Sequence, residues 1–145
     1  MVLSLGSPLL VGVYEENHLI QTYETQERTS EALPKLMKEI LESFTCKGLY
    51  FARGPGSFMA IKITYIFLRT LQQTLQCELK ACDGFVFNDH SPIPAMGKLF
   101  FVEENGKILT RVLHEPSLKP FYLPMVLDKH CFSDETEPLY ILPAV

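Results

Sequence analysis

The sequence predicts an α/β domain in which helices flank a mixed sheet. Two observations favour this class. The first half of the chain reads strand, strand, strand, helix, strand, helix, and its apolar spacing changes from short runs to a helical period. The chain has 145 residues, of which 47% are hydrophobic and 21% are charged. That length and composition fit one domain, or one domain with a reduced appendage, able to bury a core.

The predicted strands are short apolar runs bounded by turn residues. They lie at residues 2–5, 9–14, 19–25, 49–52 and 78–82. A polar stretch, Glu15-Glu16-Asn17-His18, separates the second run from the third. Runs joined in this way form antiparallel pairs, so we expect a strand–turn–strand start.

A helix is predicted after these strands. Its apolar residues recur at helical spacing as one stripe: Leu33, Leu36, Met37, Ile40, Leu41 and Phe44. Thr29 and Ser30 are candidate caps, and Glu31 suits the positive end of the helix. Because proline fits only the first turn, the regular helix is expected to start close to Pro34.

A second helix is predicted over residues 57–76, and it is apolar on more than one side. One face holds Ile61, Tyr65, Leu68, Leu71 and Leu75. Ile63, Ile66 and Phe67 lie well off that face. Two interpretations stay open: a partner protein covers the second side, or the chain covers both sides itself.

The last third of the chain contains one clear hairpin. Asn105-Gly106 lies between β-like runs at residues 98–102 and 107–113, a strong hairpin signal. Residues 90–94 carry two prolines and are a candidate boundary, and 83–88 read as a turn or short helix. Prolines in the tail leave room only for short extended pieces such as residues 121–127 and 139–142.

The charge and cysteine content argue against several classes of protein. The formal net charge is −4, and the 13 Lys and Arg residues are scattered among 17 acids. This pattern excludes an autonomous nucleic-acid binder, which needs a basic face. The four cysteines form no CxxC pair, so no structural metal is expected. With no signal-peptide pattern and no long apolar run, we expect a cytoplasmic protein without a membrane span.

The sharpest local feature is Gly54-Pro55-Gly56-Ser57-Phe58, between a predicted strand and the long helix. Glycines there allow close backbone approach, and a helix N-terminus can hold an anion. The segment lacks the lysine of a phosphate-binding loop and does not match the dinucleotide fingerprint. The residues therefore favour a tight turn in which Ser57 caps the helix.

Groups suited to catalysis are scarce. Asp89-His90 and Asp128-Lys129-His130-Cys131 are the only local clusters of acid, base and nucleophile types, and both lie in loop-like stretches. Ser57 is not in the Gly-x-Ser-x-Gly context of a nucleophile elbow. No catalytic residue is expected.

The signature region resembles the TsaB (YeaZ) family. Arg53 to Phe58, followed by Ile61-Lys62-Ile63, is similar to that family's Gly-Pro-Gly-Ser-Phe-Thr-Gly-Leu-Arg-Ile. The stretch around Leu33-Pro34 and the later Glu137-Pro138-Leu139-Tyr140-Ile141 also resemble family segments. The match covers about residues 19–79 and is faint beyond them.

The chain departs from the family at its nucleotide site. Gly6-Ser7 stands where the family's first strand ends in Asp-Thr, and that acid belongs to the nucleotide site of the wider superfamily. Met59, Ala60 and Lys62 replace Thr, Gly and Arg of the signature. The His-x-x-x-His metal pair of the catalytic paralogue, TsaD, is absent. These departures argue against ATP chemistry, a bound metal or any cofactor.

The resemblance implies an actin-like, ribonuclease-H-like (ASKHA) domain at residues 1–90. Residues 91–145 would then be a truncated second domain whose C-terminal strand returns to the first. It also implies a non-catalytic subunit that binds TsaD in the complex that makes tRNA threonylcarbamoyladenosine, together with the ATPase TsaE, and that meets tRNA only through the complex. The alternative is a degenerate homodimeric ASKHA protein with residual nucleotide binding or peptidase-like activity.

The partner surface implied by the resemblance lies on the two helices, around residues 33–44 and 58–75. Its expected residues are Leu33, Leu36, Met37, Ile40, Ile63, Ile66, Phe67 and Thr70. In isolation the same surface is expected to form a homodimer, since a small protein does not leave a large apolar patch bare.

Overall fold

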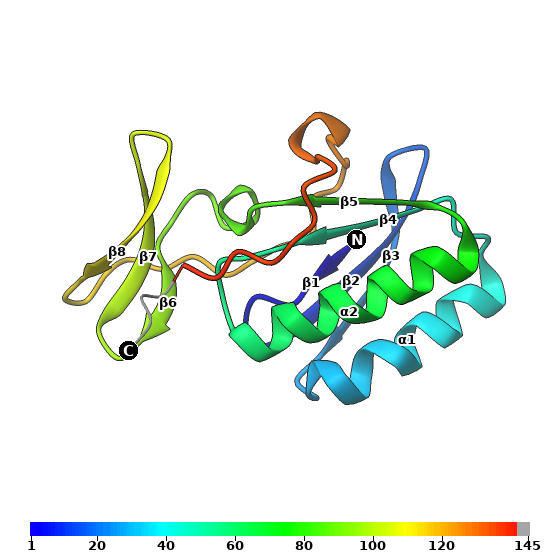
Figure 1. Ribbon diagram of the computed structural model, residues 1–145, viewed down its shortest axis with the longest axis horizontal. Coiled ribbons are helices and arrows are strands. Elements are labelled where there is room, and N and C mark those ends of the chain that lie inside the picture. Colours follow the sequence, from blue (N-terminus) through cyan, green and yellow to red (C-terminus); the bar gives the residue numbers. More distant parts are fainter. Residues whose placement is uncertain (142–145) are drawn as a thin grey trace.

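The computed structural model describes residues 1–141, which form two sheets and two long helices (Figure 1). The larger sheet has five strands in the order β3-β2-β1-β4-β5. Its strands are β1 (Val2–Leu3), β2 (Leu9–Glu15), β3 (His18–Thr25), β4 (Gly48–Ala52) and β5 (Glu78–Cys82). β2 pairs antiparallel with β1 and with β3, whereas β4 runs parallel to β1 and to β5. The predicted mixed α/β architecture is therefore confirmed.

Helices α1 (Thr29–Ser43) and α2 (Phe58–Leu75) lie side by side on one face of this sheet (Figure 1). Leu33 and Leu68 pack there against Val11, Phe51 and Leu79 of the strands. The stripe predicted from Leu33 onward does cover this face, because its spacing places those side chains on one side of α1.

The predicted start of α1 is wrong. The helix begins at Thr29, and Arg28 is its N-cap residue without a side-chain cap. Pro34 therefore lies beyond the first turn. Its ring removes the bond that would reach the carbonyl of Ser30, and Ser30 is exposed, so water can solvate that carbonyl.

The C-terminal segment covers part of the opposite face of the sheet. Phe132 and Leu127 are buried there. The Phe132 ring packs edge-on against the Tyr50 ring, with 5.2 Å between the ring centroids. Single β-bridges join His18 to Val126 and Ala81 to Ser133. Within residues 1–141 the segment forms no strand, so the predicted returning strand is corrected to an extended segment, residues 121–141, which we call the strap. Proline-rich chain cannot donate a continuous ladder of hydrogen bonds. Residue 142 of the predicted piece 139–142 lies outside the described residues.

A three-stranded sheet, β6-β7-β8, follows the short 3-10 helix Gly84–Phe87. Its strands are β6 (Ile93–Met96), β7 (Leu99–Glu104) and β8 (Lys107–Val112). The Asn105-Gly106 hairpin between β7 and β8 is confirmed, with both residues at positive φ. β6 was not predicted, because Pro94 argues against a strand. β6 lies at the edge of its sheet, where proline is tolerated. Among residues 1–141, no helix is long and apolar enough to cross a bilayer.

We expect Phe132→Ala to lower the free energy of unfolding by about 3 kcal/mol, because it removes a buried ring that contacts Tyr50 and Phe87. Val126→Ala is the matched control on the same strap. Val126 is exposed, so its change stays within about 0.5 kcal/mol. Urea titration of both variants checks this, and equally small effects would show that the strap is not packed on the sheet.

Candidate functional site

The glycine-rich turn between β4 and α2 is packed against the end of β1. Residues 54–56 are buried. A Cβ at Gly56 would lie 2.5 Å from the backbone oxygen of Leu5, and the Ser57 N–H donates to that same oxygen at 2.9 Å. Gly56 is thus required for the close approach of two backbone segments.

A second contact ties the turn to the chain that follows β5. The Gly84 N–H donates to the Gly54 carbonyl at 2.8 Å, and the Arg53 N–H donates to the Cys82 carbonyl at 2.9 Å. Gly54 has φ of +128°, a backbone conformation that favours glycine. The turn is therefore fixed by the ends of three neighbouring strands.

The C-terminal strap closes over the turn from the solvent side. The Leu139 N–H donates to the Arg53 carbonyl at 2.9 Å. The Arg53 guanidinium donates to the Glu137 carbonyl at 3.1 Å and lies 3.4 Å from the Glu135 carboxylate. The Tyr140 ring packs edge-on against the Phe58 ring, with 5.3 Å between the ring centroids. These contacts join the strap to Arg53 and Phe58, on either side of the buried residues 54–56.

The structure supports the interpretation of Gly54-Pro55-Gly56-Ser57-Phe58 as a tight turn. Ser57 is the N-cap residue of α2, as predicted, although its side chain makes no cap hydrogen bond. Gly6 and Ser7, which follow β1, are exposed, and the Ser7 hydroxyl donates to Gln26 at 2.6 Å. No carboxylate stands at these two positions to hold a nucleotide-bound cation.

The eight residues expected at a partner surface divide into three groups by burial. Leu33, Met37 and Ile40 belong to the hydrophobic core. Leu36, Ile63 and Phe67 are half-buried, and Ile66 and Thr70 are exposed. Leu33, Met37 and Ile40 of α1 are not accessible to a partner protein, so the candidate partner surface lies mainly on α2.

An apolar strip remains open on α2. We call Met59, Ile63, Ile66 and Thr70 the outer stripe of α2. Their spacing of four, three and four residues places them on one side of the helix, opposite buried Leu68. Met59 is 65% and Ile66 is 52% exposed. The sequence interpretation missed Met59, although its position seven residues before Ile66 was a usable signal.

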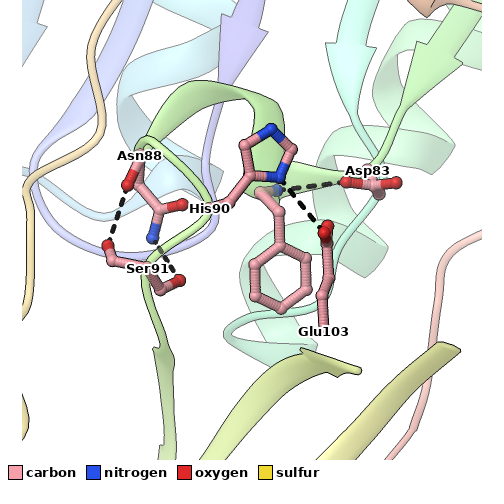
Figure 2. Close-up of polar contacts among 6 residues, drawn as sticks. Asp83, Asn88, His90, Ser91 and Glu103 are labelled. Carbon is pink, nitrogen blue, oxygen red and sulfur yellow. Dashed lines mark hydrogen bonds and ion pairs between the residues drawn. The ribbon is translucent and has the colours of Figure 1, made fainter. Parts of the chain in front are cut away.

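The acid–base clusters seen in the sequence are turn and surface features. His90 Nδ1 lies 3.1 Å from the Glu103 carboxylate, and the Asp83 carboxylate accepts from the Phe85 N–H at 3.2 Å. Both contacts are drawn as dashed lines in Figure 2. In the same turn, the Asn88 amide donates to the Ser91 carbonyl at 3.0 Å. These contacts fix the conformation of the turn between β5 and β6.

The other cluster is poorly suited to nucleophilic chemistry. The Cys131 thiol donates to the Asp128 carboxylate at 3.6 Å. Partial burial and the Asp128 charge both raise the pKa of Cys131, so its reactive thiolate is scarce at neutral pH. Within residues 1–141, no three His, Cys, Asp or Glu side chains gather as metal ligands.

No family model matches the sequence, and no curated protein matches it significantly. Solved structures do match its fold. YeaZ from Pseudomonas aeruginosa superposes with a TM-score of 0.60 over 82% of this chain, at 14% identity. An uncharacterized protein with similarity to peptidase YEAZ from Pseudomonas aeruginosa gives a TM-score of 0.54 over 76% of this chain, also at 14% identity.

The chain covers 65% of the first of these structures and 61% of the second. At this level of identity the likeness shows a shared fold. The shared fold agrees with the family resemblance carried by the turn before α2.

Proposed function

We propose that this chain, a divergent protein with the YeaZ fold, is a non-catalytic partner subunit of the tRNA threonylcarbamoyladenosine modification complex. In this proposal it binds and supports the catalytic subunit TsaD in the cytoplasm, alongside the ATPase TsaE. The observation that carries the proposal is the outer stripe of α2, an exposed apolar strip on the helix that follows the family's signature turn.

The buried signature turn supports a role in binding rather than catalysis. Gly56 lies against Leu5, and Leu139 of the strap lies against Gly54. The backbone of Gly54 and of Gly56 is therefore in contact with other segments of the chain, as expected for a packed structural turn. The sequence also lacks the acid expected after the first strand, at Gly6-Ser7. A chain that retained ATP chemistry would need an open loop backbone at the turn and an acid after the first strand.

The overall charge supports indirect contact with tRNA. A net charge of −4 disfavours unaided binding to a phosphate backbone. In isolation, the outer stripe of α2 is covered by a second copy of the chain, which gives a homodimer. TsaD replaces that copy in the complex, because only one partner can occupy the stripe.

A thermal-shift comparison tests this function against the alternative of a degenerate homodimer with residual nucleotide binding or peptidase-like activity. We expect purified TsaD from the same organism to raise the melting temperature, as any partner that binds only the folded state must. ATP with magnesium should leave it unchanged. A shift with ATP that disappears in Ser57→Ala, and no shift with TsaD, would favour the alternative.

A further inference from the structure

All the charged side chains of α2 are basic, which indicates the charge of the surface that this helix would bind. Among the 18 residues of the helix there is no acid, and its cations are Lys62 and Arg69. Both are exposed. They lie seven positions apart, so they project from the same side of the helix about 10 Å apart, along one border of the outer stripe.

Neither cation is paired with an acid in the part of the chain that the structure describes. None of the ion pairs among residues 1–141 involves Lys62 or Arg69. The Arg69 guanidinium donates to the Gln72 amide oxygen at 3.3 Å. Covering the apolar stripe would bring both charges to the rim of an interface, where an opposite charge is favourable and a like charge is not.

A second copy of the chain is a poor source of that opposite charge. On neighbouring α1, Lys35 lies 4.0 Å from the Glu27 carboxylate just before the helix, and exposed Lys38 lies four residues from Glu42. Such pairs compensate each other's charge. Within α1, three acids and two bases give a net charge of −1, against +2 for α2. Self-association therefore places cationic α2 against helices that carry little net negative charge.

We propose that α2 recognises a protein face that combines an apolar patch with carboxylates beside it, and that Lys62 and Arg69 select this acidic partner over a second copy. This inference rests on the proposed function and specifies the chemistry of the TsaD face that α2 meets. The apolar stripe supplies most of the burial, and the two cations set the choice of partner.

Salt dependence separates the two associations. Raising NaCl from about 50 mM to about 500 mM screens charges at an interface rim. We expect the Kd for TsaD, measured by titration calorimetry, to rise about tenfold. The homodimer, measured by sedimentation equilibrium, should stay unchanged or tighten.

Charge reversal tests the named residues. The double variant Lys62→Glu with Arg69→Glu should weaken TsaD binding at least tenfold at low salt and should not weaken the homodimer. Lys107→Glu, at the exposed start of β8, is the control and should change neither. Circular dichroism checks that each variant is folded.

The outcomes distinguish this inference from the proposed function. If TsaD binds the wild type but responds neither to salt nor to the double variant, the acidic-partner inference is wrong and the proposed function stands. If TsaD does not bind the folded wild type, both are overturned. Equal weakening of the homodimer and of TsaD binding would also contradict the selection of an acidic partner.

Discussion

Gly56→Ala is expected to destabilise the protein by about 2–4 kcal/mol, because the new methyl group would collide with backbone. Its Cβ would lie 2.5 Å from the Leu5 carbonyl oxygen and 2.9 Å from the Leu5 Cα. Neither atom can rotate away as a flexible side chain can. Relief would require the end of β1 and the turn to separate, which would stretch the 2.9 Å hydrogen bond from the Ser57 N–H to Leu5.

Gly6→Ala is the matched control for this substitution. It introduces the same methyl group into the segment next to Leu5, but nothing lies within 4 Å of its Cβ. We expect its free energy of unfolding to stay within about 0.5 kcal/mol of the wild type. Urea unfolding of the two variants measures the difference. Similar values for both would mean that the signature turn is not closely packed on β1.

Ile66→Glu is expected to abolish self-association and leave the chain folded. The Ile66 side chain is 52% exposed, so a carboxylate at this position stays hydrated in the monomer. In a dimer it would be covered at the centre of the outer stripe, where removing a carboxylate from water is costly even with Lys62 and Arg69 at the border. We expect the dimer dissociation constant to rise at least ~30-fold, as at other central interface positions.

Leu68→Glu provides the contrast on the same helix. Leu68 is 0% exposed, so a charge there should unfold the chain. Phe67 is half-buried against the core, and Phe67→Glu is therefore expected to lose stability as well as association. Size-exclusion chromatography with circular dichroism separates these cases. A folded Ile66→Glu variant that remains dimeric would place the interface elsewhere.

Local patterns in the sequence predicted the elements of the first sheet and the packed face of α1. The runs that became β2 to β5 are apolar, short and bounded by turns, and Leu33, Met37 and Ile40 recur at helical spacing. Such features depend on neighbours along the chain, so one sequence is enough to detect them.

Features that depend on distant segments were not predicted. β6 contains Pro94, which only an edge position permits, and the sheet edge is set by β7 and β8. The resemblance implied that the C-terminal segment returns to the first domain, but no local pattern indicated that it packs there through Phe132 against Tyr50 and Phe87. Likewise, the family resemblance placed Met37 among the candidate partner residues, and only the packing of α1 on the sheet shows that it is core.

The glycine turn illustrates both cases. Its position between a strand and a helix, and its role as a turn, were predicted from local residues. The need for glycine at position 56 was not predicted, because the pairing of β1 with β4 is what brings Leu5 close to it.

The central claim is that this chain binds TsaD through the outer stripe of α2, and calorimetric titration of TsaD tests it most directly. We predict saturable one-to-one binding for the wild type and for Gly6→Ala, and no detectable heat of binding for folded Ile66→Glu. The claim is contradicted if the wild type is folded and gives no binding, or if Ile66→Glu binds as tightly as the wild type.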